Sequence, residues 1–211
     1  MRSKKQWLRG AKLYLILDAQ VNSHAELLDI LKKSVRSGMG IVQLRDKCGC
    51  AKDILEFSRK AKKIIGGKIP LIINDRVDLA MIAQVPGVHL GQEDVLLKIA
   101  RRMMGEKAII GVSCQTLEHA RRAQREGADY IGFGSIFKTQ TKPGRMPMDL
   151  KILQKVIREI KIPVFAIGGI GRENIGLLRA LGVSRVAVCR DVCQASDVAR
   201  VVRDIKNLLI D

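Results

Sequence analysis

The run Gln43-Leu44-Arg45-Asp46-Lys47 carries one amide and two cations at alternate positions. In a β-strand, this alternation places Gln43, Arg45 and Lys47 on one side and Leu44 on the other. An amide and two cations that face the same space could bind a polar ring and a polyphosphate. The alternative is a surface ion cluster, which suits poorly a strand that is expected to be mostly buried.

Two carboxylates follow two other short apolar runs. Asp75 comes directly after 71–74, and Asp94 lies four residues after 87–90. Paired carboxylates without cysteines or clustered histidines favour a hard cation such as Mg²⁺, which completes its shell with water and substrate phosphate. Each aspartate by itself could instead cap the helix that follows it. Because cations lie nearby, the pair favours a magnesium site over two helix caps.

Two further segments offer donors to an anion. Ser113 ends an apolar run and could donate a hydrogen bond to a phosphate or an anionic leaving group. No Ser-His-Asp arrangement is indicated, so nucleophilic catalysis by Ser113 has little support, and the adjacent Cys114 is interpreted as a buried thiol. The loop 134–145, which includes Lys142, combines glycines, hydroxyls and cations. It lacks the Walker A spacing, and its composition and length are typical of a phosphate-binding lid.

These segments are positioned by short β-rich runs that alternate eight times with longer helical periods. Apolar strands alternating with helices indicate a parallel sheet covered by helices. Eight such units, without a Gly-x-Gly-x-x-Gly fingerprint, predict one (β/α)₈ TIM barrel over residues 1–211 rather than an open doubly wound sheet. The predicted strands are 13–17, 38–44, 71–74, 87–90, 108–113, 128–134, 163–169 and 184–188. The predicted helices are one capped by Ser23, 51–65, a short one after Asp75, 95–104, 116–126, 149–160, 174–181 and 195–209.

A barrel of this kind gathers its functional residues where the strands end. The loops after the seventh and eighth strands frequently bind phosphate through backbone N–H groups. Gly168-Gly169 permits the close backbone approach that this requires, and Cys189-Arg190 follows the eighth strand. Two anion sites are therefore predicted, one formed by the cations beside the metal and one by Gly169 with Cys189 and Arg190.

Composition narrows the classes of partner. The 211 residues carry 38 Lys and Arg against 21 Asp and Glu, a net charge of +17. This excess fits nucleic acid, an anionic small molecule steered into a basic cleft, or solvated helix surface. Only 3% of the residues are aromatic, which is too few for base stacking, and RNA-binding motifs are missing, so nucleic acid is disfavoured.

The remaining expectations concern location and assembly. No apolar run reaches the roughly 18 residues of a membrane helix. A short basic N-terminal extension precedes an apolar stretch too short for a signal-peptide core, and the five cysteines lack zinc-site spacing. A cytoplasmic protein with reduced thiols is predicted, and a homo-oligomer is left open.

The ordered segments QLRDK, INDR, HLGQED, IGVS, GADYIGFGSIFKTQTK and AIGGI resemble those of the thiamine phosphate synthase family, from about Leu13 to the end of the chain. The resemblance implies a transferase that joins 4-amino-2-methyl-5-hydroxymethylpyrimidine diphosphate to a thiazole phosphate, carboxylated or not, giving thiamine phosphate and pyrophosphate. It implies one Mg²⁺ on Asp75 and Asp94. The implied pyrimidine diphosphate site comprises Gln43, Leu44, Arg45, Asp46, Lys47, Asn74, Ser113 and Lys142, with Arg45, Lys47, Ser113 and Lys142 acting in catalysis. The implied thiazole phosphate site comprises Thr139, Gln140, Thr141, Gly169, Cys189 and Arg190.

Such a reaction needs no protein nucleophile, because an aminopyrimidine can push electrons toward its exocyclic methylene as the diphosphate leaves. The thiazole nitrogen then attacks that carbon. The chain departs from the usual family pattern at Gln115, where His is usual, at Ser135 and Lys138, where Pro is common, and at Arg190, where Ser is usual. The alternatives are a related thiazole tautomerase, which would use a histidine in the segment that holds Gln115, and a barrel that only binds thiazole phosphate.

Overall fold

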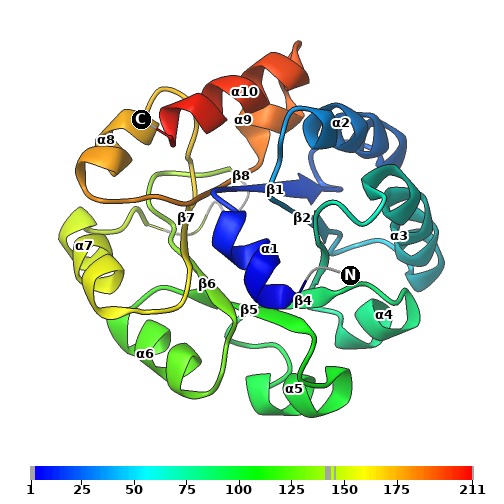
Figure 1. The fold of residues 1–211 in the computed structure, drawn as a ribbon, viewed down its shortest axis with the longest axis horizontal. Coiled ribbons are helices and arrows are strands. Elements are labelled where there is room, and N and C mark those ends of the chain that lie inside the picture. Colours follow the sequence, from blue (N-terminus) through cyan, green and yellow to red (C-terminus); the bar gives the residue numbers. More distant parts are fainter. Residues whose placement is uncertain (1–2, 141–143, 145, 211) are drawn as a thin grey trace.

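The structure, a computed structural model, describes residues 3–140, 144 and 146–210. Its centre is a closed barrel of parallel strands that follow one another in chain order from β1 to β8, and β8 pairs with β1 to complete the ring (Figure 1). Helices surround this barrel on the outside, as the figure shows. The predicted (β/α)₈ barrel is confirmed.

Each predicted strand is present, although most are trimmed at one or both ends. The strands are β1 (Leu13–Asp18), β2 (Ile41–Arg45), β3 (Leu71–Asn74), β4 (Gly87–Leu90), β5 (Ile109–Cys114), β6 (Tyr130–Phe133), β7 (Val164–Ile167) and β8 (Val186–Val188). The helices are α1 (Lys4–Gly10), α2 (His24–Arg36), α3 (Ala51–Ile65), α4 (Val77–Ile82), α5 (Leu97–Met104), α6 (Leu117–Arg125), α7 (Leu150–Glu159), α8 (Ile175–Ala180), α9 (Arg190–Cys193) and α10 (Val198–Leu208). The sequence did not predict α1 and α9, which are too short to show a helical period.

The N-terminal extension is more than a basic tail. Ser3 and Gln6 form a capping box, in which the Gln6 amide N–H donates to Ser3 Oγ at 3.3 Å and the Ser3 N–H donates to Gln6 Oε1 at 2.9 Å. Helix α1 lies across the end of the barrel where the strands begin (Figure 1), and Leu8 is buried in the barrel interior beside Tyr14 and Ile16. Burial of Leu8 stabilises a helix that would be too short to persist alone.

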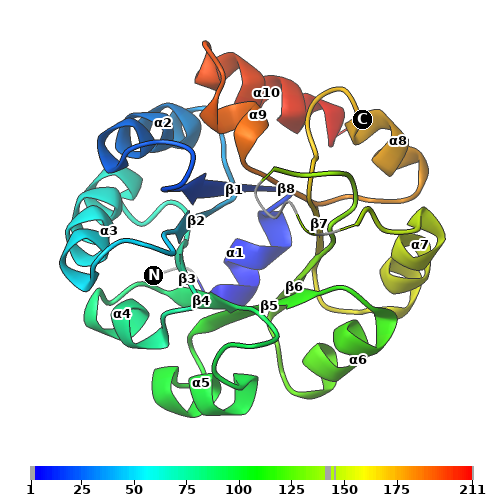
Figure 2. The same ribbon diagram turned by 180° about the vertical axis from the view of Figure 1, so that it is seen from behind.

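Side chains alternate between two apolar layers along the strands. Odd and even positions of β1 divide in this way: Leu15 and Leu17 pack outward against the helices, whereas Tyr14 and Ile16 face the interior. The register pairs Ile16 with Gln43 and Asp18 with Arg45. Polar groups at the carboxyl ends of the strands are therefore brought together at the end opposite α1, which faces the viewer in Figure 2.

The predicted cap at Ser23 is confirmed, and Thr116 caps α6 in a similar way. Ser23 accepts from the Glu26 N–H and forms a capping box, and Thr116 Oγ1 accepts from the His119 N–H at 3.0 Å. In the part of the chain that the structure describes, no helix has the length and apolar character needed to cross a bilayer.

Candidate active site

A cavity of about 520 Å³ opens at the carboxyl ends of the strands, a size typical of small-molecule sites. It brings together residues from both halves of the chain, including Arg45 of the first predicted anion site and the described residues of the second. Lys47, Asp75 and Asp94 are not among its lining residues. Of the predicted site residues, its lining includes Gln43, Arg45, Asn74, Ser113, Thr139, Gln140, Gly169, Cys189 and Arg190.

Arg45 is held by a partner that the sequence analysis missed. Its Nη1 donates at 2.8 Å to Oδ2 of Asp18 and at 2.8 Å to Oε1 of Gln20. The Asp18 side chain is only 1% exposed and comes from the end of β1, directly opposite Arg45 in the strand register. The ion pair fixes the guanidinium at the cavity wall, since a buried carboxylate without its cation is strongly unfavourable.

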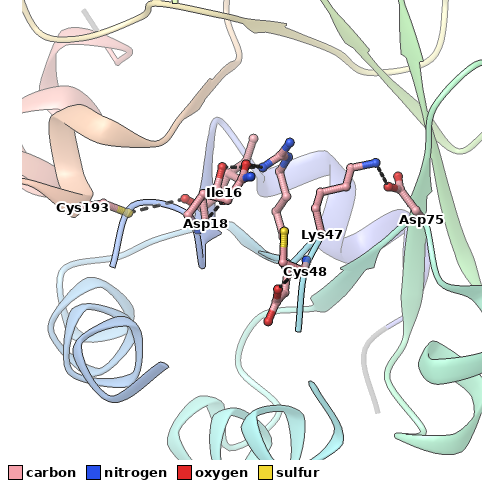
Figure 3. A network of polar contacts seen from close by, with 9 residues as sticks. Ile16, Asp18, Lys47, Cys48, Asp75 and Cys193 are labelled. Atoms are coloured by element: carbon pink, nitrogen blue, oxygen red, sulfur yellow. Dashed lines mark hydrogen bonds and ion pairs between the residues drawn. The ribbon is translucent and has the colours of Figure 1, made fainter. Parts of the chain in front are cut away.

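Lys47 and the two predicted metal carboxylates form a second charged group. The Lys47 ammonium pairs with Asp75 Oδ2, and Figure 3 shows the lysine side chain extended across to the end of β3. Asp94 Oδ2 accepts from the Gly91 N–H at 2.6 Å. Burial and a hydrogen-bonding contact with Asp94 raise the pKa of Asp75, while Lys47 opposes the shift. The carboxyl groups of Asp75 and Asp94 thus lie close together, and each disfavours ionisation of the other.

This pair fits a hard cation. A divalent metal would relieve the repulsion between Asp75 and Asp94, and carboxylate oxygens are the ligands that Mg²⁺ prefers. The helix-cap alternative is wrong, because the residues at the N-caps of α4 and α5 are Arg76 and Leu96. Among the described residues no cluster of three or more His, Cys, Asp or Glu could hold a metal, so other ligands would come from water and substrate phosphate.

Two residues of the predicted pyrimidine diphosphate site have their side chains elsewhere. Leu44 is buried in the outer layer, which agrees with the predicted alternation but leaves only its main chain near the site. Asp46 accepts from His24 Nε2 at 2.9 Å and from the N–H groups of Cys48 at 3.1 Å and Gly49 at 2.6 Å. The Asp46 carboxylate therefore organises the loop that carries Lys47.

A polar group that the sequence analysis missed lies inside the barrel. Tyr14 and Tyr130 share a hydrogen bond of 2.8 Å between their hydroxyls, and Gln43 Nε2 donates to Tyr14 at 2.7 Å. His89 contacts Tyr130 through Nδ1 and Ser113 Oγ through Nε2. Nδ1 of His89 thus meets the Tyr130 phenol and not a carboxylate, so the described residues form no Ser-His-Asp triad at Ser113. In the sequence, this group was indicated only by one tyrosine in each of two otherwise apolar strands.

The predicted interpretation of Cys114 as a buried thiol agrees with its surroundings. Burial in the layer between strands and helices raises the pKa of Cys114 to about 12. None of the five cysteines, all of them in the described part of the chain, forms a disulfide.

The segment after β6 lies against β7. The N–H groups of Ile136 and Phe137 donate at 2.9 Å to the carbonyl oxygens of Ile167 and Gly168, which seats this segment beside the glycine turn. Thr139 and Gln140 reach the cavity from here. The predicted residues Thr141 and Lys142 lie outside the described residues.

Gly169 is required by this packing. Its φ is +61°, and a Cβ added there would lie 2.4 Å from the Lys138 carbonyl oxygen and 2.9 Å from Phe137 Cβ. We expect Gly169→Ala to push the segment 136–140 away from the turn. The affinity for the thiazole phosphate that the sequence resemblance implies should then fall about tenfold or more. Calorimetric titration with that phosphate tests this, and Gly176→Ala, in open space on α8, is the control. Unchanged affinity in Gly169→Ala would contradict the expected role.

The second predicted anion site has an unusual cation. Arg190 lines the cavity, and its Nε is buried with no hydrogen-bond partner among the described residues. Nearby, Arg172 binds Asp191 through its main-chain N–H at 2.9 Å and through its guanidinium at 3.1 Å. A donor without a partner at the wall of a cavity suits an anionic ligand.

Cys189 enters this site as a neutral thiol. A hydrogen bond with Cys193 is the main cause that raises the pKa of Cys189, and burial is the second cause. The Cys193 thiol in turn donates to the Ile16 carbonyl oxygen at 3.5 Å (Figure 3). The contribution of Cys189 to an anion site is therefore shape and a main-chain group and not a thiolate.

Known proteins share both the sequence and the fold. A family model described as thiamine monophosphate synthase matches residues 13–192. The chain is 40% identical over 198 residues to a thiamine-phosphate synthase of Clostridium acetobutylicum, covering 92% of this chain and 94% of that protein. It is 36% identical over 199 residues to a thiamine-phosphate synthase of Fusobacterium nucleatum, with 94% and 97% covered.

A solved structure agrees. Thiamine phosphate pyrophosphorylase from Pyrococcus furiosus superposes with a TM-score of 0.85 at 29% identity, covering 97% of each chain. The structure of 3-hexulose-6-phosphate synthase, at 14% identity and a TM-score of 0.71, shares the fold alone. The extent of the sequence match, together with the polar groups at one end of the barrel, shows that the chain belongs to the thiamine monophosphate synthase family of transferases.

Proposed function

We propose that the chain condenses 4-amino-2-methyl-5-hydroxymethylpyrimidine diphosphate with a thiazole phosphate, releasing pyrophosphate and thiamine phosphate. One observation carries the proposal: Lys47 pairs with Asp75, whose carboxyl group contacts Asp94, and Arg45, two residues before Lys47, lines the cavity. A diphosphate leaving group needs both, because cations neutralise its charge and carboxylates hold the metal that shares it.

The pyrimidine half of the site supports departure of the diphosphate without a protein nucleophile. Gln43 presents an amide to the aminopyrimidine ring, and Asn74 adds a second one. Arg45, Lys47 and Ser113 would stabilise the charge that develops on the leaving oxygen, and Lys142 would add a further cation.

Asp75 and Asp94 would hold one Mg²⁺. When bound, this metal supplies Lewis-acid stabilisation of the diphosphate as its bond to the methylene carbon breaks. Lys47 would exchange part of its pairing with Asp75 for the diphosphate oxygens.

The other half of the cavity would hold the thiazole phosphate. Thr139, Gln140, Thr141, Gly169, Cys189 and Arg190 form this proposed subsite. Arg190 carries the charge, and the glycine turn admits the phosphate to backbone N–H groups. The subsite would place the thiazole nitrogen in line with the methylene carbon and exclude water from the cation formed there.

The two alternatives lack the same support. A thiazole tautomerase would be expected to carry a histidine where Gln115 stands, and it has no use for paired carboxylates beside Arg45 and Lys47. A barrel that only binds thiazole phosphate would explain Arg190 but not the charged group at β2 and β3. We further infer small phosphorylated substrates as the partners and the cytoplasm as the place of action.

A coupled assay tests the proposal. Both purified substrates are supplied with and without Mg²⁺, and thiamine phosphate and pyrophosphate are followed together. Metal-dependent formation of both products, lost in Asp94→Ala, is the expected result. Binding of the pyrimidine diphosphate without turnover would point to a failed thiazole site around Arg190, and absence of both binding and turnover would refute the proposal.

Lys142 provides a separate prediction. We expect Lys142→Ala to lower kcat by about 10²-fold, as the loss of one preorganised electrostatic donor does. Single-turnover measurements at saturating substrate separate this effect from binding, and Lys151→Ala on α7 is the matched control. A wild-type single-turnover rate in Lys142→Ala would remove the assigned role.

A further inference from the structure

A chain of hydrogen bonds crosses the barrel interior between two residues that the proposed function places at the substrate. It runs from the Gln43 amide through Tyr14 and Tyr130 to the His89 ring, and it ends at Ser113. The successive distances are 2.7, 2.8, 3.1 and 3.0 Å. Gln43 and Ser113 lie on β2 and β5, which are not neighbours in the barrel, so the chain links otherwise separate parts of the site.

The two tyrosines at its centre are fixed and neutral. Both are buried, and their rings pack edge to face on Phe165 with centroid distances of 5.3 and 5.6 Å. Burial raises the pKa of Tyr14 and of Tyr130, so both hydroxyls keep their protons. Each tyrosine hydroxyl therefore has one proton to donate.

This count determines the direction of the chain. Gln43 Nε2 donates to Tyr14, so the Tyr14 proton is left for Tyr130. If Tyr130 donated to Tyr14 instead, the buried Tyr14 proton would have no acceptor among the described residues, which is costly. With Tyr14 as donor, the Tyr130 proton goes to His89 Nδ1. In a neutral imidazole the proton then lies on Nε2 and is donated to Ser113 Oγ.

We propose that Tyr14, Tyr130 and His89 are positioning residues that orient Gln43 as a hydrogen-bond acceptor and Ser113 as a hydrogen-bond donor toward the substrate. The role at the substrate rests on the proposed function, whereas the direction of the chain does not.

The two ends then match the substrate. With Nε2 engaged by Tyr14, the Gln43 carbonyl oxygen is the group left to accept, and the exocyclic amino group of an aminopyrimidine is a donor. Ser113 Oγ accepts from His89, so its own proton can point into the cavity and toward an anionic leaving group. The reverse direction would commit the Ser113 proton to His89 and turn a lone pair toward the diphosphate, which is unfavourable.

The direction can be read from the protonation of one ring. The chain has three histidines, so ¹⁵N-histidine labelling gives three imidazole spectra, which His24→Gln and His119→Gln assign by difference. In the wild-type protein without substrate, we expect His89 to carry its proton on Nε2. A proton on Nδ1 would overturn the inference, and this test needs no substitution in any residue of the hydrogen-bond chain.

Two matched variants test the two ends of the hydrogen-bond chain separately. Tyr130→Phe removes the donor to His89, so we expect the histidine to become a mixture of tautomers and kcat to fall about tenfold, the value of one hydrogen bond. Tyr14→Phe removes the acceptor of Gln43 but leaves Tyr130 as donor, so the tautomer should not change. There the KM for the pyrimidine diphosphate should rise about tenfold instead.

The outcomes distinguish this inference from the proposed function. If Tyr130→Phe keeps the wild-type His89 tautomer and the wild-type kcat, the proposed positioning role of the hydrogen-bond chain is refuted, although the enzyme is fully active. A wild-type protein with the proton on Nε2 that fails to turn over would refute the proposed reaction and leave the direction of the chain established.

Discussion

Replacing Arg45 with alanine should lower the free energy of unfolding by about 3–5 kcal/mol and reduce kcat/KM by about 10²–10³-fold. The loss of stability follows from Asp18, whose carboxylate is 1% exposed and would remain buried without its cation. The loss of activity follows from the missing guanidinium at the cavity wall. Urea unfolding and steady-state kinetics measure the two effects separately.

A double variant separates the effect of the buried charge on stability from the effect of the guanidinium on activity. In the double variant Asp18→Asn/Arg45→Met both charges are gone, so most of the lost stability should return while activity stays low. Arg121→Ala is the surface control, because its ion pair with Glu159 is about half exposed and contributes roughly 0–1 kcal/mol. Equal losses of stability in Arg45→Ala and Arg121→Ala would show that the Asp18 pair is not buried in solution.

Asp75→Asn should abolish the response to Mg²⁺ and lower activity by about 10²-fold or more, yet it should not destabilise the metal-free fold. Burial and Asp94 raise the pKa of Asp75 above its ordinary value of 3.8, so the folded chain disfavours the ionised form. The stabilisation associated with the protonated form is complete below pH 3.8 and is lost as the pH rises through the raised pKa. At neutral pH, asparagine removes that penalty.

The measurement is thermal unfolding of both proteins in EDTA and in Mg²⁺. In EDTA, the Tm of Asp75→Asn should exceed that of the wild type at neutral pH, and the difference should shrink as the pH falls. Mg²⁺ should raise the Tm of the wild type but not that of Asp75→Asn, because a ligand stabilises the state that binds it. Asp78→Asn, which removes an exposed carboxylate that Arg76 holds at lowered pKa, should retain the Mg²⁺ response. A full Mg²⁺ response in Asp75→Asn would contradict the proposed site.

Much of the site followed from position in a strand. Alternation predicted that Gln43, Arg45 and Lys47 lie on one side and that Leu44 lies on the other. The structure agrees up to Arg45, where β2 ends, whereas Lys47 is not among the residues that line the cavity. The same reasoning cannot assign roles beyond the strand. Asp46, one residue after β2, was grouped with the diphosphate site, whereas its carboxylate holds its own loop and His24.

By itself, the sequence determined the number and order of the strands, the covering helices and the positions where chemistry gathers, because apolar periodicity reflects local geometry and burial. Only the tertiary structure decided the partners: Asp18 for Arg45, and Tyr14 for Tyr130, which are 116 residues apart. Such pairs depend on the closure and register of the barrel, which no local pattern encodes. The same applies to α1, since its seven residues are stabilised by packing across the barrel end and not by their own helical propensity.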